Sequence, residues 1–136
     1  MKNFVLLFVM AGLLAVSSCK DDESDRFKFL TGTTWVPVSL LANGTDATGP
    51  GGLLEDFAGE ANFNTDGTGT FGSYSGTWRF EQGEEQLIIS SPDLAISVTL
   101  NITELTASSL KLQGSLPDPA NLTGPFINIE MTFRAK

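Results

Sequence analysis

Carboxylates are the main side chains of this sequence that could do acid–base chemistry. The chain has no histidine and a single cysteine, which excludes Ser-His-Asp and Cys-His nucleophile systems and zinc sites built on histidine or paired cysteines. Paired carboxylates can hydrolyse a glycosidic bond, and the candidates are Glu55/Asp56, Glu84/Glu85 and Glu60. These residues fall in expected loops or at strand ends, which favours solvated surface positions. We therefore expect a protein that is not an enzyme.

A calcium site is the second chemistry to consider. Residues 62–67 partly match the start of an EF-hand loop, but the residue eleven positions after Asn62 is Ser73, where the motif requires a bidentate Glu. Asp66-Gly67 instead predicts a type I′ hairpin turn, because glycine tolerates a positive φ. We expect no metal ion and no cofactor.

Charge and composition restrict the possible partners. Eight Lys and Arg residues against sixteen Asp and Glu residues give a formal charge of −8. The chain therefore lacks the basic surface that binds nucleic acid or anionic lipid headgroups. Apolar residues make up 41% and charged residues 18% of the 136 positions, which predicts one folded domain.

The N-terminus has the features of a secretory leader. Lys2 is followed by an uncharged apolar run over residues 4–16, which is too short to span a bilayer. The sequence Val16-Ser-Ser-Cys19 resembles the bacterial lipobox, in which the chain is cut before the cysteine and the cysteine is acylated. We expect a signal peptide at residues 1–18 and a membrane anchor at acylated Cys19. A plain signal peptide and an uncleaved anchor remain alternatives.

Residues 19–28 are expected to form a solvated, charged tether between the membrane and the domain. Within it, Asp21, Asp22 and Glu23 resemble the acidic run that follows the lipid-bearing cysteine in surface-exposed lipoproteins of Bacteroidetes, where it acts as an export signal. The resemblance implies a lipid-anchored protein of the bacterial outer membrane, displayed on the cell surface. A generic hydrophilic tether is the alternative.

The rest of the chain, residues 29–136, has the period-2 alternation of antiparallel strands. For example, Ile127, Ile129, Met131 and Phe133 alternate with polar neighbours. Eight strands are predicted, at residues 33–41, 59–65, 68–73, 75–81, 86–90, 94–104, 108–116 and 125–135. Short connections favour an up-and-down order, and eight such strands can close into a barrel without free edges. The predicted fold is an all-β, eight-stranded antiparallel up-and-down barrel that follows the lipoprotein signal peptide.

Residues 42–58 interrupt this pattern. The Gly-rich segment 43–52 predicts irregular structure, and Leu53, Leu54 and Phe57 have the spacing of one helical turn laid over a barrel end.

Three motifs resemble, in their order, the lipocalin-like domain of small Bacteroidetes lipoproteins. They are the opening at residues 30–35, the hairpin at residues 63–68 and the Gly-x-Trp strand at residues 75–80. The resemblance covers residues 29–135, although true lipocalins place Gly-x-Trp on the first strand. It implies a barrel-closing contact between Trp35 and Arg134. A weaker likeness, to META β domains, rests on the Trp-Val-x-Val-Ser-Leu opening.

The aromatic residues are the candidate lining of a ligand pocket, and the alternative is a core filled by its own side chains. These residues are Trp35, Phe63, Phe71, Tyr74, Trp78, Phe80 and Phe133. The first functional hypothesis is a non-enzymatic lipoprotein that binds a small apolar ligand or a partner at a barrel mouth framed by residues 42–58. The alternative is an accessory, inhibitory or envelope-assembly protein that acts through its surface. The sequence leaves the oligomeric state open.

Overall fold

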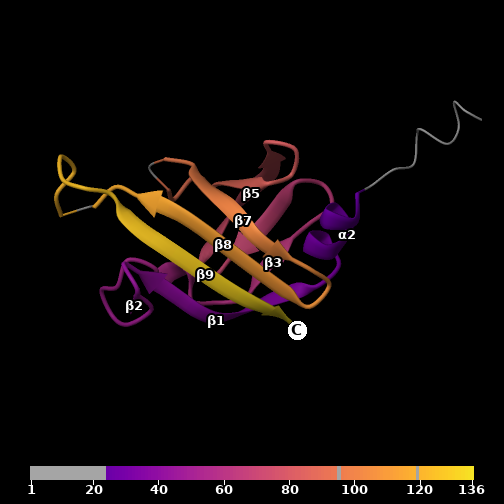
Figure 1. Ribbon diagram of the computed structural model, residues 1–136, viewed down its shortest axis with the longest axis horizontal. Coiled ribbons are helices and arrows are strands. Elements are labelled where there is room, and N and C mark those ends of the chain that lie inside the picture. Colours follow the sequence, from indigo (N-terminus) through magenta and orange to yellow (C-terminus); the bar gives the residue numbers. More distant parts are fainter. Residues whose placement is uncertain (1–23, 95, 119) are drawn as a thin grey trace, which may run out of the picture.

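Nine strands form one antiparallel sheet that closes on itself (Figure 1). This computed structural model describes residues 24–94, 96–118 and 120–136. The strands are β1 (Thr34–Ala42), β2 (Thr45–Asp46), β3 (Ala61–Phe63), β4 (Thr68–Phe71), β5 (Tyr74–Glu81), β6 (Gln86–Ser90), β7 (Val98–Leu105), β8 (Ser109–Leu116) and β9 (Ile127–Ala135). Eight of them, β1 and β3–β9, pair in chain order, and β9 pairs back with β1. The predicted eight-stranded up-and-down barrel is confirmed.

The additional strand, β2, was not predicted. Asn43 and Gly44 have φ values of 49° and 80°, which allows a tight hairpin in which Leu41 pairs with Asp46. The Asn-Gly pair is a recognised signal for this turn. The prediction that residues 43–52 contain no regular structure was therefore wrong at Thr45–Asp46, although the other residues of the segment are irregular.

Two other local predictions need correction. The connection at Asp66-Gly67 is a four-residue loop, in which the Gly67 amide donates to the carbonyl of Asn64 over 3.1 Å. Only Gly67 has a positive φ there, so the turn is not type I′, which needs positive φ at both central residues. Strand β7 begins at Val98 instead of residue 94, because β6 pairs with it only as far as Ile89.

The barrel interior contains only apolar side chains. Along β9, for example, Ile129, Met131 and Phe133 are buried, whereas the residues between them face outward. No polar or charged residue is buried among those that the structure describes. The alternation seen in the sequence therefore separates an apolar interior from a polar outer wall.

A short helix, α2 (Asp25–Thr31), covers one end of the barrel. The Ser24 side chain accepts a hydrogen bond from the Phe27 amide and caps its start. Leu30 is fully buried, and its carbonyl oxygen accepts a hydrogen bond from Trp35 Nε1 over 3.0 Å. Residues 25–28, expected to belong to the tether, are instead the first part of this docked helix.

The two ends of the barrel are therefore different. The turns at residues 64–67, 82–85 and 106–108 lie at the α2 end. The opposite end, here called the distal end, is formed by residues 43–58, 72–73, 91–94, 96–97, 117–118 and 120–126. A 3-10 helix, η1 (Glu55–Phe57), lies in the first of these segments. None of the helices in the described part of the chain has the length and apolar character needed to cross a membrane.

Candidate functional site

The aromatic residues predicted to line a pocket pack mainly against one another. Phe63 lies 5.3 Å from Phe71 and 5.7 Å from Trp78, measured between ring centroids, and Trp78 lies 5.4 Å from Phe80. Phe27 of α2 reaches the same cluster, at 5.8 Å from Trp78. Tilted and edge-on pairs at these distances attract each other. The rings therefore occupy the space that a ligand would need.

Not all seven candidate residues belong to this cluster. Trp35 and Phe133 are buried, but no aromatic contact joins either of them to the cluster. Tyr74 is only partly buried, at the distal end, where its ring lies 4.9 Å from that of Phe57. Five of the seven therefore meet inside the barrel: Phe63, Phe71, Trp78 and Phe80 through their rings, and Phe133 through the small cavity that it lines with Phe63 and Phe71.

The cavity that the described core side chains enclose is small. A cavity of about 10 Å³ lies among Phe57, Phe63, Phe71, Met131 and Phe133. This volume suffices for at most one water molecule, whereas small-molecule sites enclose about 300–1,000 Å³. This cavity is therefore far too small for a small-molecule ligand.

Both ends of the barrel are covered. Helix α2 covers one end, and at the distal end Leu54 and Phe57, on either side of the start of η1, are buried against the core. The predicted helical turn over a barrel end is thus confirmed. The predicted mouth at residues 42–58 is not an opening into the interior, because these same side chains fill it.

The predicted barrel-closing pair, Trp35 with Arg134, does not form. Trp35 pairs in the sheet with Ala135, and Arg134 pairs with Val36. Because side chains alternate between the two faces of a sheet, buried Trp35 and exposed Arg134 lie on opposite sides of the wall. The indole N–H bonds to α2 instead.

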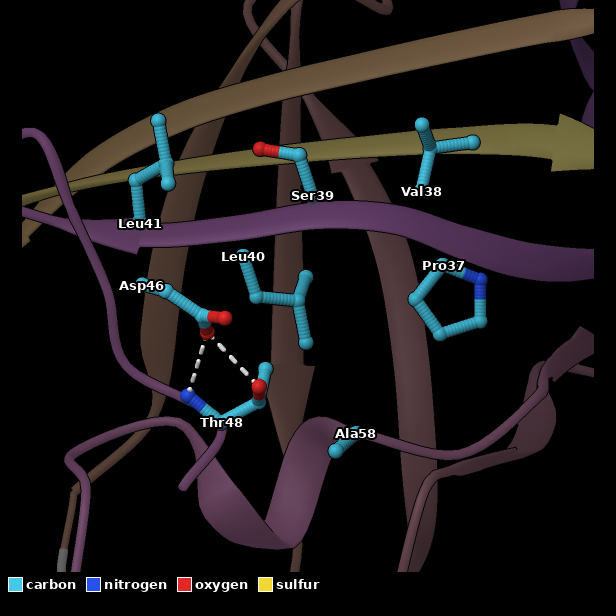
Figure 2. A pocket seen from close by; sticks show the side chains of 8 residues that line it. All are labelled: Pro37, Val38, Ser39, Leu40, Leu41, Asp46, Thr48 and Ala58. Atoms are coloured by element: carbon cyan, nitrogen blue, oxygen red, sulfur yellow. Dashed lines mark hydrogen bonds between the residues drawn. The ribbon is translucent and has the colours of Figure 1, made fainter.

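A surface groove of about 430 Å³ lies beside β1 (Figure 2). It exists because β1 pairs with β3 only at Thr34 and Trp35, and with β2 only at Leu41 and Ala42. Between these positions the strand edge faces residues 46–58 across a gap. Residue alternation does not signal this groove, because the groove depends on how few residues β3 contributes to the sheet.

The groove has an apolar floor and an anionic rim. Pro37 and Leu40 point from β1 into the space, and Ala58 faces them from the segment after η1 (Figure 2). At the rim, Asp46 accepts hydrogen bonds from the hydroxyl and the amide of Thr48, over 2.6 and 2.9 Å. These bonds hold the pKa of Asp46 below its ordinary value, so its carboxylate stays ionised at neutral pH.

The carboxylates that could have formed a catalytic pair each bond to a different neighbour. Glu55 accepts from the Gly51 amide over 2.9 Å, and Asp56 accepts from the Tyr74 hydroxyl over 3.3 Å. Burial, with the nearby charge of Asp56, raises the pKa of Tyr74. At the α2 end, the Glu84 carboxylate accepts a hydrogen bond from the Ser24 hydroxyl over 2.5 Å, and its backbone carbonyl accepts one from Arg26 Nε over 2.9 Å. These contacts are those of surface carboxylates that hold loops in place.

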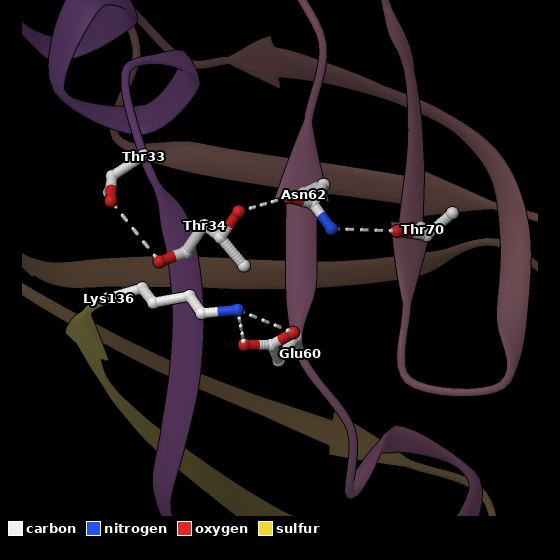
Figure 3. Close-up of polar contacts among 6 residues, drawn as sticks. All are labelled: Thr33, Thr34, Glu60, Asn62, Thr70 and Lys136. Atoms are coloured by element: carbon white, nitrogen blue, oxygen red, sulfur yellow. Dashed lines mark hydrogen bonds and ion pairs between the residues drawn. The ribbon is translucent and has the colours of Figure 1, made fainter.

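Glu60 likewise has a structural partner. It forms an ion pair of 3.0 Å with Lys136, which ties the C-terminus to the start of β3 (Figure 3). Beside it, Thr34 donates to Asn62 over 2.6 Å, and Asn62 donates to Thr70 over 3.2 Å. This row of polar contacts joins β1, β3 and β4 across the outer wall. It adds to the backbone pairing of β3, which has only three residues. In the described ranges, no three acidic, cysteine or histidine side chains gather as a metal site would require.

The predictions for the N-terminal region are the signal peptide, lipidation of Cys19 and the export signal at Asp21, Asp22 and Glu23. They fall outside the residues that the structure describes and stay predictions. Comparison with models of protein families finds no match, and comparison with curated proteins finds none either.

Proposed function

We propose that this protein is a lipid-anchored protein of the bacterial outer membrane that acts through the outside of a filled barrel, as an accessory or inhibitory partner of another protein. The observation that carries the proposal is the cavity among the described core side chains, which measures only about 10 Å³. A lipocalin-like carrier needs an internal pocket some thirtyfold larger at the least. A barrel of this kind serves as a rigid platform for its loops.

The anchor fixes the orientation of this platform. Acyl chains on Cys19 hold the chain at the membrane, since each buried CH₂ contributes about 0.8 kcal/mol. The described chain starts at Ser24, beside α2. Only a few residues separate Cys19 from Ser24, and an extended chain spans at most about 3.3–3.6 Å per residue. The α2 end therefore faces the membrane, and the distal end faces away from it.

Replacement of Cys19 tests the anchor. In bacterial cells, the Cys19→Ser variant is expected to lose incorporation of labelled palmitate and to leave the membrane fraction, while the unchanged protein retains both. Proteolysis of intact cells tests surface display. The unchanged chain is expected to be cut, and a variant with Asp21→Asn, Asp22→Asn and Glu23→Gln to be protected. Recovery of the unchanged protein in the soluble fraction, without acylation, would contradict the proposal.

A second candidate function, binding of a small apolar ligand, is favoured by the volume of the β1 groove. At about 430 Å³ the groove falls within the range of small-molecule sites. The neutral dye Nile red provides a probe, because the anionic rim at Asp46 does not repel it. Ala58→Trp fills the groove and is expected to abolish saturable dye binding, whereas Ala107→Trp, at an exposed loop of the α2 end, leaves it unchanged. Absence of saturable binding to the unchanged protein would exclude this candidate.

A further inference from the structure

The distal end exposes large apolar side chains. Four large hydrophobic residues of the described chain are strongly exposed, and three of them belong to distal loops: Ile96 at 56%, Leu122 at 73% and Phe126 at 60%. Single exposed hydrophobic residues are common and need no explanation. Two of these, however, lie four residues apart on one loop, here called the β8–β9 loop, whose described residues 117–118 and 120–126 project beyond the barrel (Figure 1).

The β8–β9 loop is held in shape by its own backbone. The Asn121 amide donates to the carbonyl of Asp118 over 3.1 Å, and the Gly124 amide donates to the carbonyl of Asn121 over 3.0 Å. These bonds form two successive turns, and Leu122 occupies a central position of the second. Pro117 and Pro125 restrict the backbone at the two ends of the loop. A preformed loop loses little conformational entropy on binding. The second turn therefore presents Leu122 on an ordered backbone, and Pro125 restricts the backbone next to Phe126.

The charge around these side chains is of one sign. Residues 43–58, 72–73, 91–97 and 117–126 contain no Lys or Arg. The acidic residues of the same segments are Asp46, Glu55, Asp56, Asp93 and Asp118. Asp118 lies on the β8–β9 loop itself, where it accepts a hydrogen bond from the Ala120 amide.

This charge selects among the surfaces that could cover Leu122 and Phe126. A second copy of the chain docked by the same end would bring five carboxylates against five. A membrane rich in anionic lipid would repel the same carboxylates. A protein that carries an apolar pocket bordered by Lys and Arg would satisfy both the exposed side chains and the charge.

We propose that the β8–β9 loop inserts Leu122 and Phe126 into an apolar pocket of a partner protein whose rim is basic. The inference rests on the proposed surface-acting function and names the surface and the chemistry of its partner. Because the distal end faces away from the membrane, the partner approaches from the side opposite the anchor.

The test places a photo-crosslinking amino acid at position 122 or 126 of the full acylated chain in cells that express it. Position 107, in an exposed loop of the α2 end, is the matched control. The expected result is one adduct with one heterologous protein from positions 122 and 126, and none from position 107. An adduct with twice the mass of the chain, an adduct with lipid, equal adducts from position 107, or no adduct would each overturn the proposal.

The partner identified in this way is then purified and titrated with the full chain. Leu122→Ala with Phe126→Ala is expected to weaken the affinity by about 30-fold or more, as removal of central apolar anchors does. Ala107→Ser, at the exposed loop of the α2 end, should change it by less than about twofold. Raising the salt concentration from about 50 to about 500 mM should slow association on the order of tenfold.

Two results of the titration would overturn the proposal: an affinity that the double variant leaves unchanged, or an association rate that salt leaves unchanged. Phosphatidylcholine vesicles serve as a separate probe, and binding to them that needs Leu122 and Phe126 would also overturn it. The proposed function has its own test in the acylation and fractionation of the Cys19→Ser variant. Failure at the loop with normal anchoring therefore removes only the docking surface.

Discussion

Replacing Trp35 with Phe tests how α2 is held on the barrel. The indole Nε1 lies 3.0 Å from the carbonyl oxygen of Leu30, and both side chains are fully buried. Phe keeps an aromatic ring but leaves this carbonyl without a donor, which costs about 1–3 kcal/mol. The smaller ring leaves a void of roughly 40 Å³, which costs about 1 kcal/mol more. We expect a loss of about 2–4 kcal/mol in the free energy of unfolding.

The assay is urea unfolding followed by far-ultraviolet circular dichroism, with Arg134→Ala as the matched control. Arg134 is exposed on the outer face of β9, so its removal should change the unfolding free energy by no more than about 0.5 kcal/mol. Hydrogen exchange should also show that Trp35→Phe accelerates exchange of the α2 amides more than that of the β8 amides. If Arg134→Ala destabilises the protein as much as Trp35→Phe, the conclusion that these side chains lie on opposite faces is wrong.

Two further predictions concern the backbone and the acidic turn. A Cβ at Gly76 would lie 1.9 Å from the carbonyl oxygen of Ser90, so Gly76→Ala should lower the free energy of unfolding by about 2–3 kcal/mol or more. Gly49→Ala, where no atom lies within 4 Å, should change it by no more than about 0.5 kcal/mol in the same denaturation assay. The hydroxyl and amide of Thr68 hold the pKa of Asp66 below its ordinary value, so the stabilisation is present above about pH 4 and is lost as the pH falls through the lowered pKa. Thr68→Val should raise this pKa in an NMR titration, and an unchanged value would refute the assigned cause.

The sequence predicts the barrel well because one physical signal is repeated in each strand. Alternation places apolar residues on one face, as in Ile129 and Met131 of β9, and closing the sheet buries all eight such faces. Alternation does not say where pairing stops. Leu94 and Ile96 continue the pattern of β7, but β6 has no residues opposite them, so Ile96 is exposed instead of buried.

Helix α2 was missed because its apolar residues are few and lie in a charged segment. Phe27 and Leu30 have helical spacing, and Ser24 is a favourable N-cap, but seven residues are too few to be stable alone. The helix is stabilised by burial of Leu30 and by the Trp35 indole. Both contacts come from tertiary structure, which local periodicity does not encode.

The candidate site depends on side-chain packing and strand register, which residue alternation in the sequence does not encode. Whether a barrel is hollow depends on how side chains from different strands interdigitate, as Phe63, Phe71 and Trp78 do here. The side of the wall on which Arg134 lies depends on the register of β1 and β9. Trp35 pairs with Ala135 and not with Arg134, so Arg134 lies on the opposite side from Trp35. The β1 groove and the turns of the β8–β9 loop likewise follow from pairing and local hydrogen bonds.

Native mass spectrometry of the protein extracted gently from its membrane tests the central claim most directly, since a barrel filled by its own side chains has nothing to carry. The expected spectrum contains the acylated chain alone. Leu100→Ala provides the positive control, because it removes a fully buried side chain and should open a cavity that takes up benzene. A small apolar molecule retained in equal amount by the unchanged chain, and also by Ala58→Trp, would place a ligand inside the barrel and contradict the account.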